Sequence, residues 1–308
     1  MEKIKGLITA PFTPMLQDGT VNLDMIQSLY EVYRKNNVVG VFVNGSTGEG
    51  LSLTTGERKR IAEVWSEVVD DDFKLIIHVG HSSIYEAKEI TRHASSLNIS
   101  GVATVGPFYS KPSSLDQLVE FCAEISQCSP ELPFYYYHIP ALTGVHFSMA
   151  DFLLKASQRI PNLQGVKYTD TNLVDFYRCR QVQDGRFDLL YGNDELLICG
   201  LSLGAQGFVG STYNYMPHLY YEIMDAFQHG DVQRARELQG LSMEVIRIIG
   251  SYEYNGAAKQ VMKLLGLDLG PVRLPLKNLT GDEIRELKAR LKETDFFDYT
   301  INVEGVKQ

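Results

Sequence analysis

Eight short apolar runs alternate with longer amphipathic segments along most of the chain, and this alternation limits the possible folds more than any other feature. The runs are GLITAP, VVGVFVNG, KLIIHVG, GVATVGP, LPFYYYHIP, LQGVKYT, DLLYGND and GAQGFVGS. Strands that are apolar throughout are typical of a parallel sheet with both faces covered. Helical spacing lies between the runs, for example over residues 55–69, 84–97, 114–125 and 215–227. Eight strand–helix units favour an α/β fold of the (β/α)8 TIM barrel type over a doubly wound sheet.

The pattern changes after residue 230. Residues 231–249, 255–265 and 280–293 have helical spacing, and no strand pattern lies between them. A single α/β barrel often reaches the length of this chain, 308 residues. We therefore expect a barrel over residues 1–229 and a C-terminal helical extension over residues 230–308 that packs on the barrel as part of the same domain.

Charge and cysteine content narrow the possible partners. The net charge of -9 argues against a nucleic acid or an anionic membrane as partner, because either would need basic patches. The four cysteines form no C-x-x-C pair, and the first residues lack the pattern of a signal peptide. No uncharged apolar run approaches transmembrane length. We expect a cytoplasmic protein with a small-molecule substrate, and a small anion remains a possible ligand.

One lysine interrupts a run that otherwise looks buried. Lys167 lies in LQGVKYT, close to the carboxyl end of the expected sixth strand. Its long stem could carry the charged head to solvent at the barrel rim, as lysines often do. Alternatively the amine lies inside the barrel, where burial disfavours its charged form and the neutral amine can attack a ketone to form a Schiff base. The residue alone does not decide between the two.

A glycine-rich segment, GSTGEG at residues 45–50, follows the expected second strand. It lacks the G-x-x-x-x-G-K-[ST] pattern of a phosphate loop. It could be a simple turn into the next helix. It could also form an anion cradle, in which backbone amides and the hydroxyls of Ser46 and Thr47 hold a carboxylate.

Tyrosines and histidines supply further candidates. Residues 135–137 are three tyrosines on one expected strand, so alternate rings face opposite sides, and Tyr137 is the nearest to the strand end. A phenol beside a cationic imine can transfer protons. The histidines show neither the H-E-x-x-H pattern nor a ligand cluster, so we expect structural roles and no metal; they are His78, His81, His93, His138 and His146.

Five segments together resemble the N-acetylneuraminate lyase / dihydrodipicolinate synthase family of Schiff-base aldolases. They are GSTGE at Gly45, PFY at Pro107, YHIP at Tyr137, GVK at Gly165 and GSTYN at Gly210, and they follow the family order along nearly the whole chain. The resemblance implies a (β/α)8 barrel with a helical extension, a homotetramer, and an aldolase that needs no cofactor.

Within this family, FYYYHIPALTGV at residues 134–145 resembles the branch that cleaves N-acetylneuraminate reversibly to pyruvate and N-acetylmannosamine. Synthases of the family carry an arginine where this chain has Leu142, and an apolar side chain cannot replace bidentate guanidinium recognition. The alternatives are another pyruvate-dependent aldolase of the family, such as one for 2-keto-3-deoxy sugar acids, or dihydrodipicolinate synthase. A non-catalytic pyruvate-binding relative and a metal-dependent barrel aldolase are more distant alternatives.

The resemblance also implies roles for individual residues. Lys167 is the expected Schiff-base nucleophile and Tyr137 the expected proton relay. Ser46 and Thr47 are expected to bind the substrate carboxylate. The remaining expected substrate contacts are Thr169 near the reacting centre and Gly192, Asp194, Glu195 and Ser211 along the polyhydroxylated chain. Tyr109 matches a tyrosine that acts across a subunit contact, although Phe108 differs from the tyrosine of some relatives.

Overall fold

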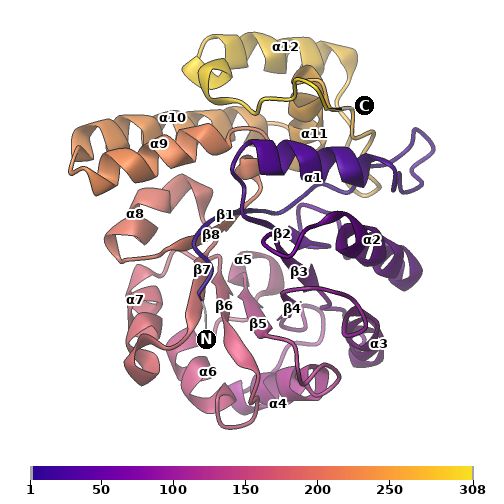
Figure 1. Ribbon diagram of the computed structural model, residues 1–308, viewed down its shortest axis with the longest axis vertical. Coiled ribbons are helices and arrows are strands. Elements are labelled where there is room, and N and C mark those ends of the chain that lie inside the picture. Colours follow the sequence, from indigo (N-terminus) through magenta and orange to yellow (C-terminus); the bar gives the residue numbers. More distant parts are fainter. Residues whose placement is uncertain (1–2, 307–308) are drawn as a thin grey trace.

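The computed structural model describes residues 3–306, and its centre is a closed barrel of eight parallel strands (Figure 1). Each strand pairs with its sequence neighbours, and the first pairs with the last. The strands are β1 (Gly6–Thr9), β2 (Gly40–Val43), β3 (Lys74–His78), β4 (Gly101–Val105), β5 (Phe134–His138), β6 (Leu163–Tyr168), β7 (Asp188–Tyr191) and β8 (Gly207–Gly210). The expected (β/α)8 TIM barrel is confirmed.

The strands are apolar throughout because the barrel buries both of their faces. On β5, Tyr135 and Tyr137 point into the barrel, where they join a cluster that includes Phe42. Tyr136, between them, points outward and packs against Phe152 of α6 (Met149–Ala156), with the rings tilted and their centres 4.7 Å apart. The alternation expected for the three tyrosines therefore places Tyr137 inside the barrel.

Helices surround the barrel, and several of them begin at side-chain caps. They are α1 (Met25–Lys35), α2 (Thr55–Val68), α3 (Ile84–Ala94), α4 (Leu115–Ser126), α5 (Pro140–Thr143), α6, α7 (Leu173–Gln181), α8 (Leu197–Ser202) and α9 (Pro217–Gln228). The helices that begin at side-chain caps are α2, α3, α4, α6 and α7. Thr54 and Glu57 form a capping box at the start of α2. Short 3-10 helices lie at η1 (Val182–Gly185), η2 (Asp194–Leu196) and η3 (Thr212–Asn214).

The expected start of the helix at residue 215 was wrong. Pro217 is the first residue of α9, and Met216 is its N-cap. Proline suits the first helical position because its ring fixes φ and its missing N–H would have no partner there. Tyr215 instead closes the 3-10 turn η3, and its amide donates to the Thr212 carbonyl at 3.1 Å.

The C-terminal extension is helical, as expected, and comprises α10 (Val232–Gly250), α11 (Tyr254–Leu264), α12 (Gly281–Lys292) and the 3-10 helix η4 (Asp295–Tyr299). In Figure 1 these helices form a layer on one side of the barrel, with α10 beside α9. The hydroxyls of Tyr220 on α9 and Ser242 on α10 lie 2.9 Å apart in this contact. The start of α11 approaches the segment that follows β2, which brings the extension to the open end of the barrel.

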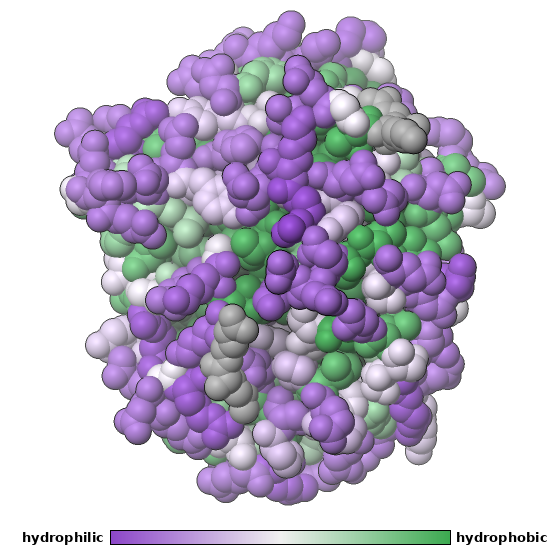
Figure 2. Space-filling view, viewed as in Figure 1, coloured by the Kyte–Doolittle hydropathy of each residue, from purple (hydrophilic) through white to green (hydrophobic). Residues whose placement is uncertain are grey.

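The surface of the molecule is more hydrophilic than the apolar core of the barrel (Figure 2). The face shown in Figure 2 is covered mainly by hydrophilic residues, with smaller apolar patches between them. Among residues 3–306, no helix combines the length and the apolar character needed to cross a membrane.

Candidate active site

A cavity of about 460 Å³ opens at the carboxyl ends of the barrel strands. It is lined by segments that follow β1, β2, β5, β6, β7 and β8 and by the start of α11. Nine residues expected from the sequence line it: Ser46, Thr47, Tyr137, Lys167, Thr169, Gly192, Asp194, Glu195 and Ser211. These residues come from five separate strand ends, so the closure of the barrel brings them together.

Lys167 lies inside the barrel at this cavity, and only 4% of its surface is exposed. Its Nζ is 3.7 Å from the ring centre of Tyr137 and 4.5 Å from that of Phe42. No carboxylate in residues 3–306 lies within ion-pair distance of this Nζ. The alternative of a lysine head at the solvent-exposed rim therefore does not hold. The amine sits in an aromatic pocket and faces the cavity.

Tyr137 is placed beside Lys167 by the pairing of β5 with β6, in which the two residues are register partners. Its ring meets Phe42 and His78 edge-on, with centre distances of 5.4 Å and 5.9 Å. Its hydroxyl makes no hydrogen bond with another described residue. The phenol is therefore held by packing and keeps its hydroxyl available for a ligand.

The segment 45–50 forms a compact turn at the cavity edge. The Glu49 amide donates to the Ser46 carbonyl at 3.1 Å, and the Gly50 amide donates to the Gly45 carbonyl at 3.0 Å. By contrast, the amides of Ser46 and Thr47 donate no hydrogen bond to any group in residues 3–306. Both residues line the cavity. Unpaired amides beside two hydroxyls can bind a carboxylate.

Thr169 and Gly192 approach each other closely across the cavity wall. A Cβ added at Gly192 would lie 2.1 Å from the Thr169 Oγ1, so a larger residue at this position would have to displace the Thr169 hydroxyl. The Thr169 amide donates to the His138 carbonyl at 2.8 Å, and the Gly192 amide donates to the Tyr168 carbonyl at the same distance. These bonds fix the backbone at the ends of β6 and β7.

The two acidic residues after β7 differ in their surroundings. Asp194 is buried, and its Oδ2 accepts from the Thr212 amide at 3.0 Å and from the Thr212 hydroxyl at 2.6 Å. Burial, together with the charge of Glu195, raises the pKa of Asp194 to about 6. Glu195 is exposed and forms no ion pair with a described residue. Glu195 can therefore accept hydrogen bonds from a ligand. In Asp194 only Oδ2 is occupied within the protein, because the buried Oδ1 accepts no hydrogen bond from a described residue.

The extension contributes residues that the sequence did not indicate. Glu253, Tyr254 and Asn255, at the start of α11, line the cavity. The hydroxyl of Tyr254 is 2.9 Å from the Ser211 Oγ and 3.1 Å from the Tyr215 hydroxyl. No local sequence pattern indicates these contacts, because the chain between Ser211 and Tyr254 contains only helical patterns. The cavity is also lined by Ala10, Ile139, Leu142, Asn193, Val209 and Gly210.

Tyr109 lies apart from this cavity. It follows β4, 90% of its surface is exposed, and it does not line the cavity within its own chain. Its expected role across a subunit contact stays a prediction.

The histidines make separate contacts. His78 Nδ1 lies 3.0 Å from the Asn44 carbonyl oxygen, and burial lowers the pKa of this imidazole. His138 Nε2 lies 3.5 Å from the nearer Asp170 carboxylate oxygen. In the part of the chain that the structure describes, no three His, Cys, Asp or Glu side chains are grouped so that they could hold a metal ion.

Comparison with known proteins identifies the family. Residues 3–294 match the dihydrodipicolinate synthetase family. The N-acetylneuraminate lyase of Homo sapiens is 38% identical over 309 residues, which cover 99% of this chain and 97% of the relative. That of Danio rerio is 42% identical over 281 residues, with 90% and 92% covered. The solved structure of Proteus mirabilis N-acetylneuraminate lyase has a TM-score of 0.93 at 38% identity and covers 96% of this chain and 100% of its own. Because the family match spans nearly the whole chain and these relatives are 38% and 42% identical to it, the chain belongs to the dihydrodipicolinate synthetase family.

Proposed function

We propose that this protein is a class I aldolase that cleaves N-acetylneuraminate reversibly to pyruvate and N-acetylmannosamine. The observation that carries the proposal is the buried Lys167 amine, which faces the cavity beside Tyr137. Relatives that align with nearly the whole chain bear the name N-acetylneuraminate lyase. No cofactor takes part in the proposed reaction.

In the first step, the open-chain keto acid binds with its carboxylate on the amides and hydroxyls of Ser46 and Thr47. The neutral Lys167 amine attacks the C2 ketone, and loss of water gives a protonated imine. The amine lies against two aromatic faces, and such faces also attract the cationic imine that replaces it.

In the second step, the hydroxyl at C4 loses its proton and becomes the aldehyde carbonyl. The electron pair of the C3–C4 bond moves to the iminium, which becomes a neutral enamine. Tyr137 relays the proton between this hydroxyl and the carboxylate region of the substrate. The enamine is then protonated at C3, and water releases pyruvate and the free lysine.

The part of the cavity wall that follows β7 and β8 favours a polyhydroxylated substrate. The exposed Glu195 carboxylate accepts from substrate hydroxyls, and Gly192, Asp194 and Ser211 line the same side. Thr169 contacts the substrate near the reacting centre. Leu142 also lines the cavity, in the place where synthases of the family carry an arginine. A second carboxylate would find no guanidinium from this residue, which disfavours the synthase reaction.

We further propose that the enzyme is a homotetramer in the cytoplasm. The four cysteines are free, which suits a reducing compartment. The exposed Tyr109 would meet a neighbouring subunit in such an assembly. A native mass of four times the 34.6 kDa chain would support this assembly.

The proposal is tested by pyruvate release from N-acetylneuraminate. We expect release by the unmodified protein and a loss on the order of 10⁴-fold in Lys167→Ala, because the covalent route is removed. Lys155→Ala is a matched control, since Lys155 is an exposed lysine on α6, away from the cavity. A 2-keto-3-deoxy sugar acid and other aldehydes with pyruvate would reveal a different family aldolase. Normal turnover by Lys167→Ala would contradict the mechanism.

A further inference from the structure

The segment 45–50 adopts a conformation that its own sequence does not favour. Glu49 has a φ of 54°, in the left-handed region that is costly for most residues with a Cβ; the preceding Asn44 has a φ of 60°, which asparagine adopts more readily. A Cβ at Gly50 would lie 1.9 Å from the Asn44 carbonyl oxygen, so the turn is closely packed. Such a conformation persists only where the surrounding structure holds it.

Glu49 is held by the C-terminal extension. Its Oε1 lies 3.3 Å from the Nζ of Lys259 on α11, and each of the two side chains is 1% exposed. Its Oε2 accepts from the backbone amide of Arg273 at 2.9 Å. The Lys259 ammonium also donates to the Pro271 carbonyl at 2.7 Å. Glu49 does not line the cavity, so this buried carboxylate is used to anchor the turn.

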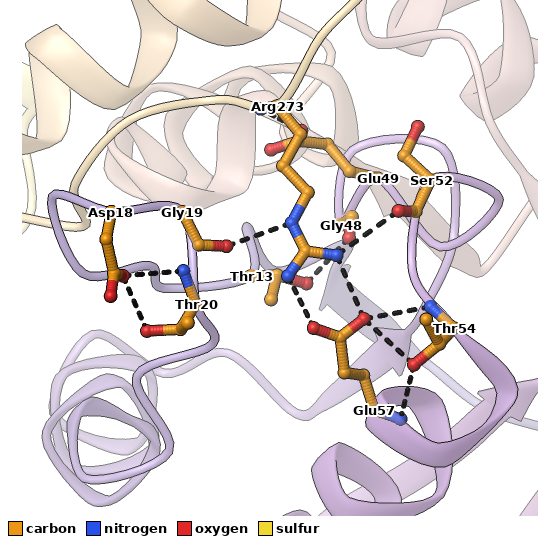
Figure 3. Close-up of polar contacts among 10 residues, drawn as sticks. All are labelled: Thr13, Asp18, Gly19, Thr20, Gly48, Glu49, Ser52, Thr54, Glu57 and Arg273. Atoms are coloured by element: carbon orange, nitrogen blue, oxygen red, sulfur yellow. Dashed lines mark hydrogen bonds and ion pairs between the residues drawn. The ribbon is translucent and has the colours of Figure 1, made fainter.

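The Arg273 side chain hydrogen-bonds to three segments beside the same turn (Figure 3). Its guanidinium binds both carboxylate oxygens of Glu57, the residue that caps α2 with Thr54. Its Nε donates to the Gly19 carbonyl at 3.0 Å, and its Nη1 donates to the Ser52 carbonyl at 3.3 Å. One side chain of the extension therefore joins the segments that follow β1 and β2 and the start of α2.

A third contact comes from the first turn of α11. Asn255 Nδ2 lies 3.5 Å from the carbonyl oxygens of both Ser46 and Thr47. These are the two residues whose amides are unpaired at the cavity. Lys259 lies one turn further along the same helix. The extension thus contacts the turn at its carbonyls, through Asn255, and at its buried carboxylate, through Lys259 and Arg273.

We propose that Lys259 and Arg273 are positioning residues that set the carboxylate-binding amides of Ser46 and Thr47 from the C-terminal extension. This inference rests on the proposed function, since it assigns the turn to the carboxylate of the keto acid. Loss of this positioning should affect only the carboxylate end of the substrate. A displaced turn weakens the binding of pyruvate, whereas the wall that holds the aldehyde, with Glu195, stays in place.

The test measures the KM values of both substrates in the synthetic direction. Lys259→Met keeps an unbranched side chain but leaves Glu49 buried without its counter-charge. We expect its KM for pyruvate to rise about 10-fold or more, because small displacements at a binding site are costly. Its KM for N-acetylmannosamine and its kcat at saturating pyruvate should stay within about 2-fold of the unmodified values.

Two further variants separate positioning from general damage. Glu49→Gln with Lys259→Met removes both charges of the pair, and we expect it to recover most of the affinity for pyruvate. Lys263→Met is the matched control on the same helix, because Lys263 forms an exposed pair with Asp268 at 2.6 Å, and its KM values should not change. Thermal unfolding shows that each variant is folded at the assay temperature.

An unchanged KM for pyruvate in folded Lys259→Met, or an equal rise in both KM values, would overturn the inference. If Lys259→Met does not fold, Arg273→Gln carries the same comparison, with the same expected and contradicting results. Borohydride trapping of the unmodified protein with pyruvate separates the two proposals. Without an adduct the proposed function fails, whereas an adduct together with unchanged KM values removes only the positioning role.

Discussion

The Nζ of Lys167 lies 3.7 Å from the Tyr137 ring centre, and no described carboxylate is within ion-pair distance. Aromatic faces attract a cation without neutralising it. The same surroundings therefore suit both a free amine that attacks a ketone and the positively charged imine that follows.

Tyr137→Phe tests the role of the phenol at the same position. The ring packs against Phe42 and His78, and phenylalanine keeps this packing while it removes the hydroxyl. We expect kcat to fall about 10²-fold or more, the usual contribution of a general acid or base, with little change in the KM for pyruvate. Steady-state kinetics measure both values. A large rise in KM with an unchanged kcat would remove the proton-transfer role.

A buried acid outside the cavity, Asp188, makes stability depend on pH. Asp188 accepts from the Tyr135 hydroxyl at 2.9 Å and from the Ile4 amide at 3.3 Å. Burial raises its pKa from 3.8 to about 6. Because the folded state holds the proton more tightly than the unfolded state, this contribution to stability is full below about pH 4 and is lost as the pH rises through about 6.

Asp188→Asn removes this titration. We expect the free energy of unfolding of the variant to rise by ~2 kcal/mol relative to the unmodified protein between about pH 4 and about pH 7. Denaturant unfolding of both proteins at equal concentration measures the difference. If the difference between the two proteins does not change with pH, the buried carboxylate does not titrate as described.

At the scale of elements, the approach of β6 to β7 sets the position of Lys167. A Cβ at Gly165, two residues before Lys167, would lie 1.7 Å from the Asp188 carbonyl oxygen. Gly165→Ala must therefore move one strand away from the other. We expect a loss of stability of about 1–3 kcal/mol, as for other overpacked sites, and a lower rate of pyruvate release.

Gly240→Ala is the matched control for this prediction. Gly240 lies within α10, and apart from its chain neighbours and the adjacent helix backbone no described atom is within 4 Å of an added Cβ. Alanine is the better helix former, so this change should stabilise the protein by roughly 0.5–1 kcal/mol. Thermal and denaturant unfolding compare the two variants. Equal effects of the two changes would mean that the strand contact at Gly165 is not tight.

Strand and helix periodicity predicted the elements well, because each is decided by residues next to one another in sequence. The first and last residues of a helix follow less directly from periodicity, because each end depends on a single capping residue. The sequence suggested a helix from residue 215, but Pro217 begins it, because the 3-10 turn η3 ends just before. In β5, by contrast, the two-residue alternation correctly placed Tyr137 inside the barrel.

At the scale of the whole molecule, the site joins parts that are distant in the chain. Asn255 and Ser46, whose groups lie 3.5 Å apart, are separated by 209 residues. The residue types at strand ends could be read from the sequence because the barrel has one functional end. The contacts of Tyr254 and Lys259 on α11, and of Arg273 in the segment after it, could not, since the extension packs on the barrel through long-range contacts that leave no local pattern.

Trapping with borohydride tests the central claim most directly. The protein is incubated with pyruvate, reduced, digested, and examined by mass spectrometry for the modified peptide. We predict one stable adduct, located on Lys167, and no adduct in Lys167→Ala. An adduct on a different lysine, or none in the unmodified protein under conditions where it releases pyruvate from N-acetylneuraminate, would contradict the account.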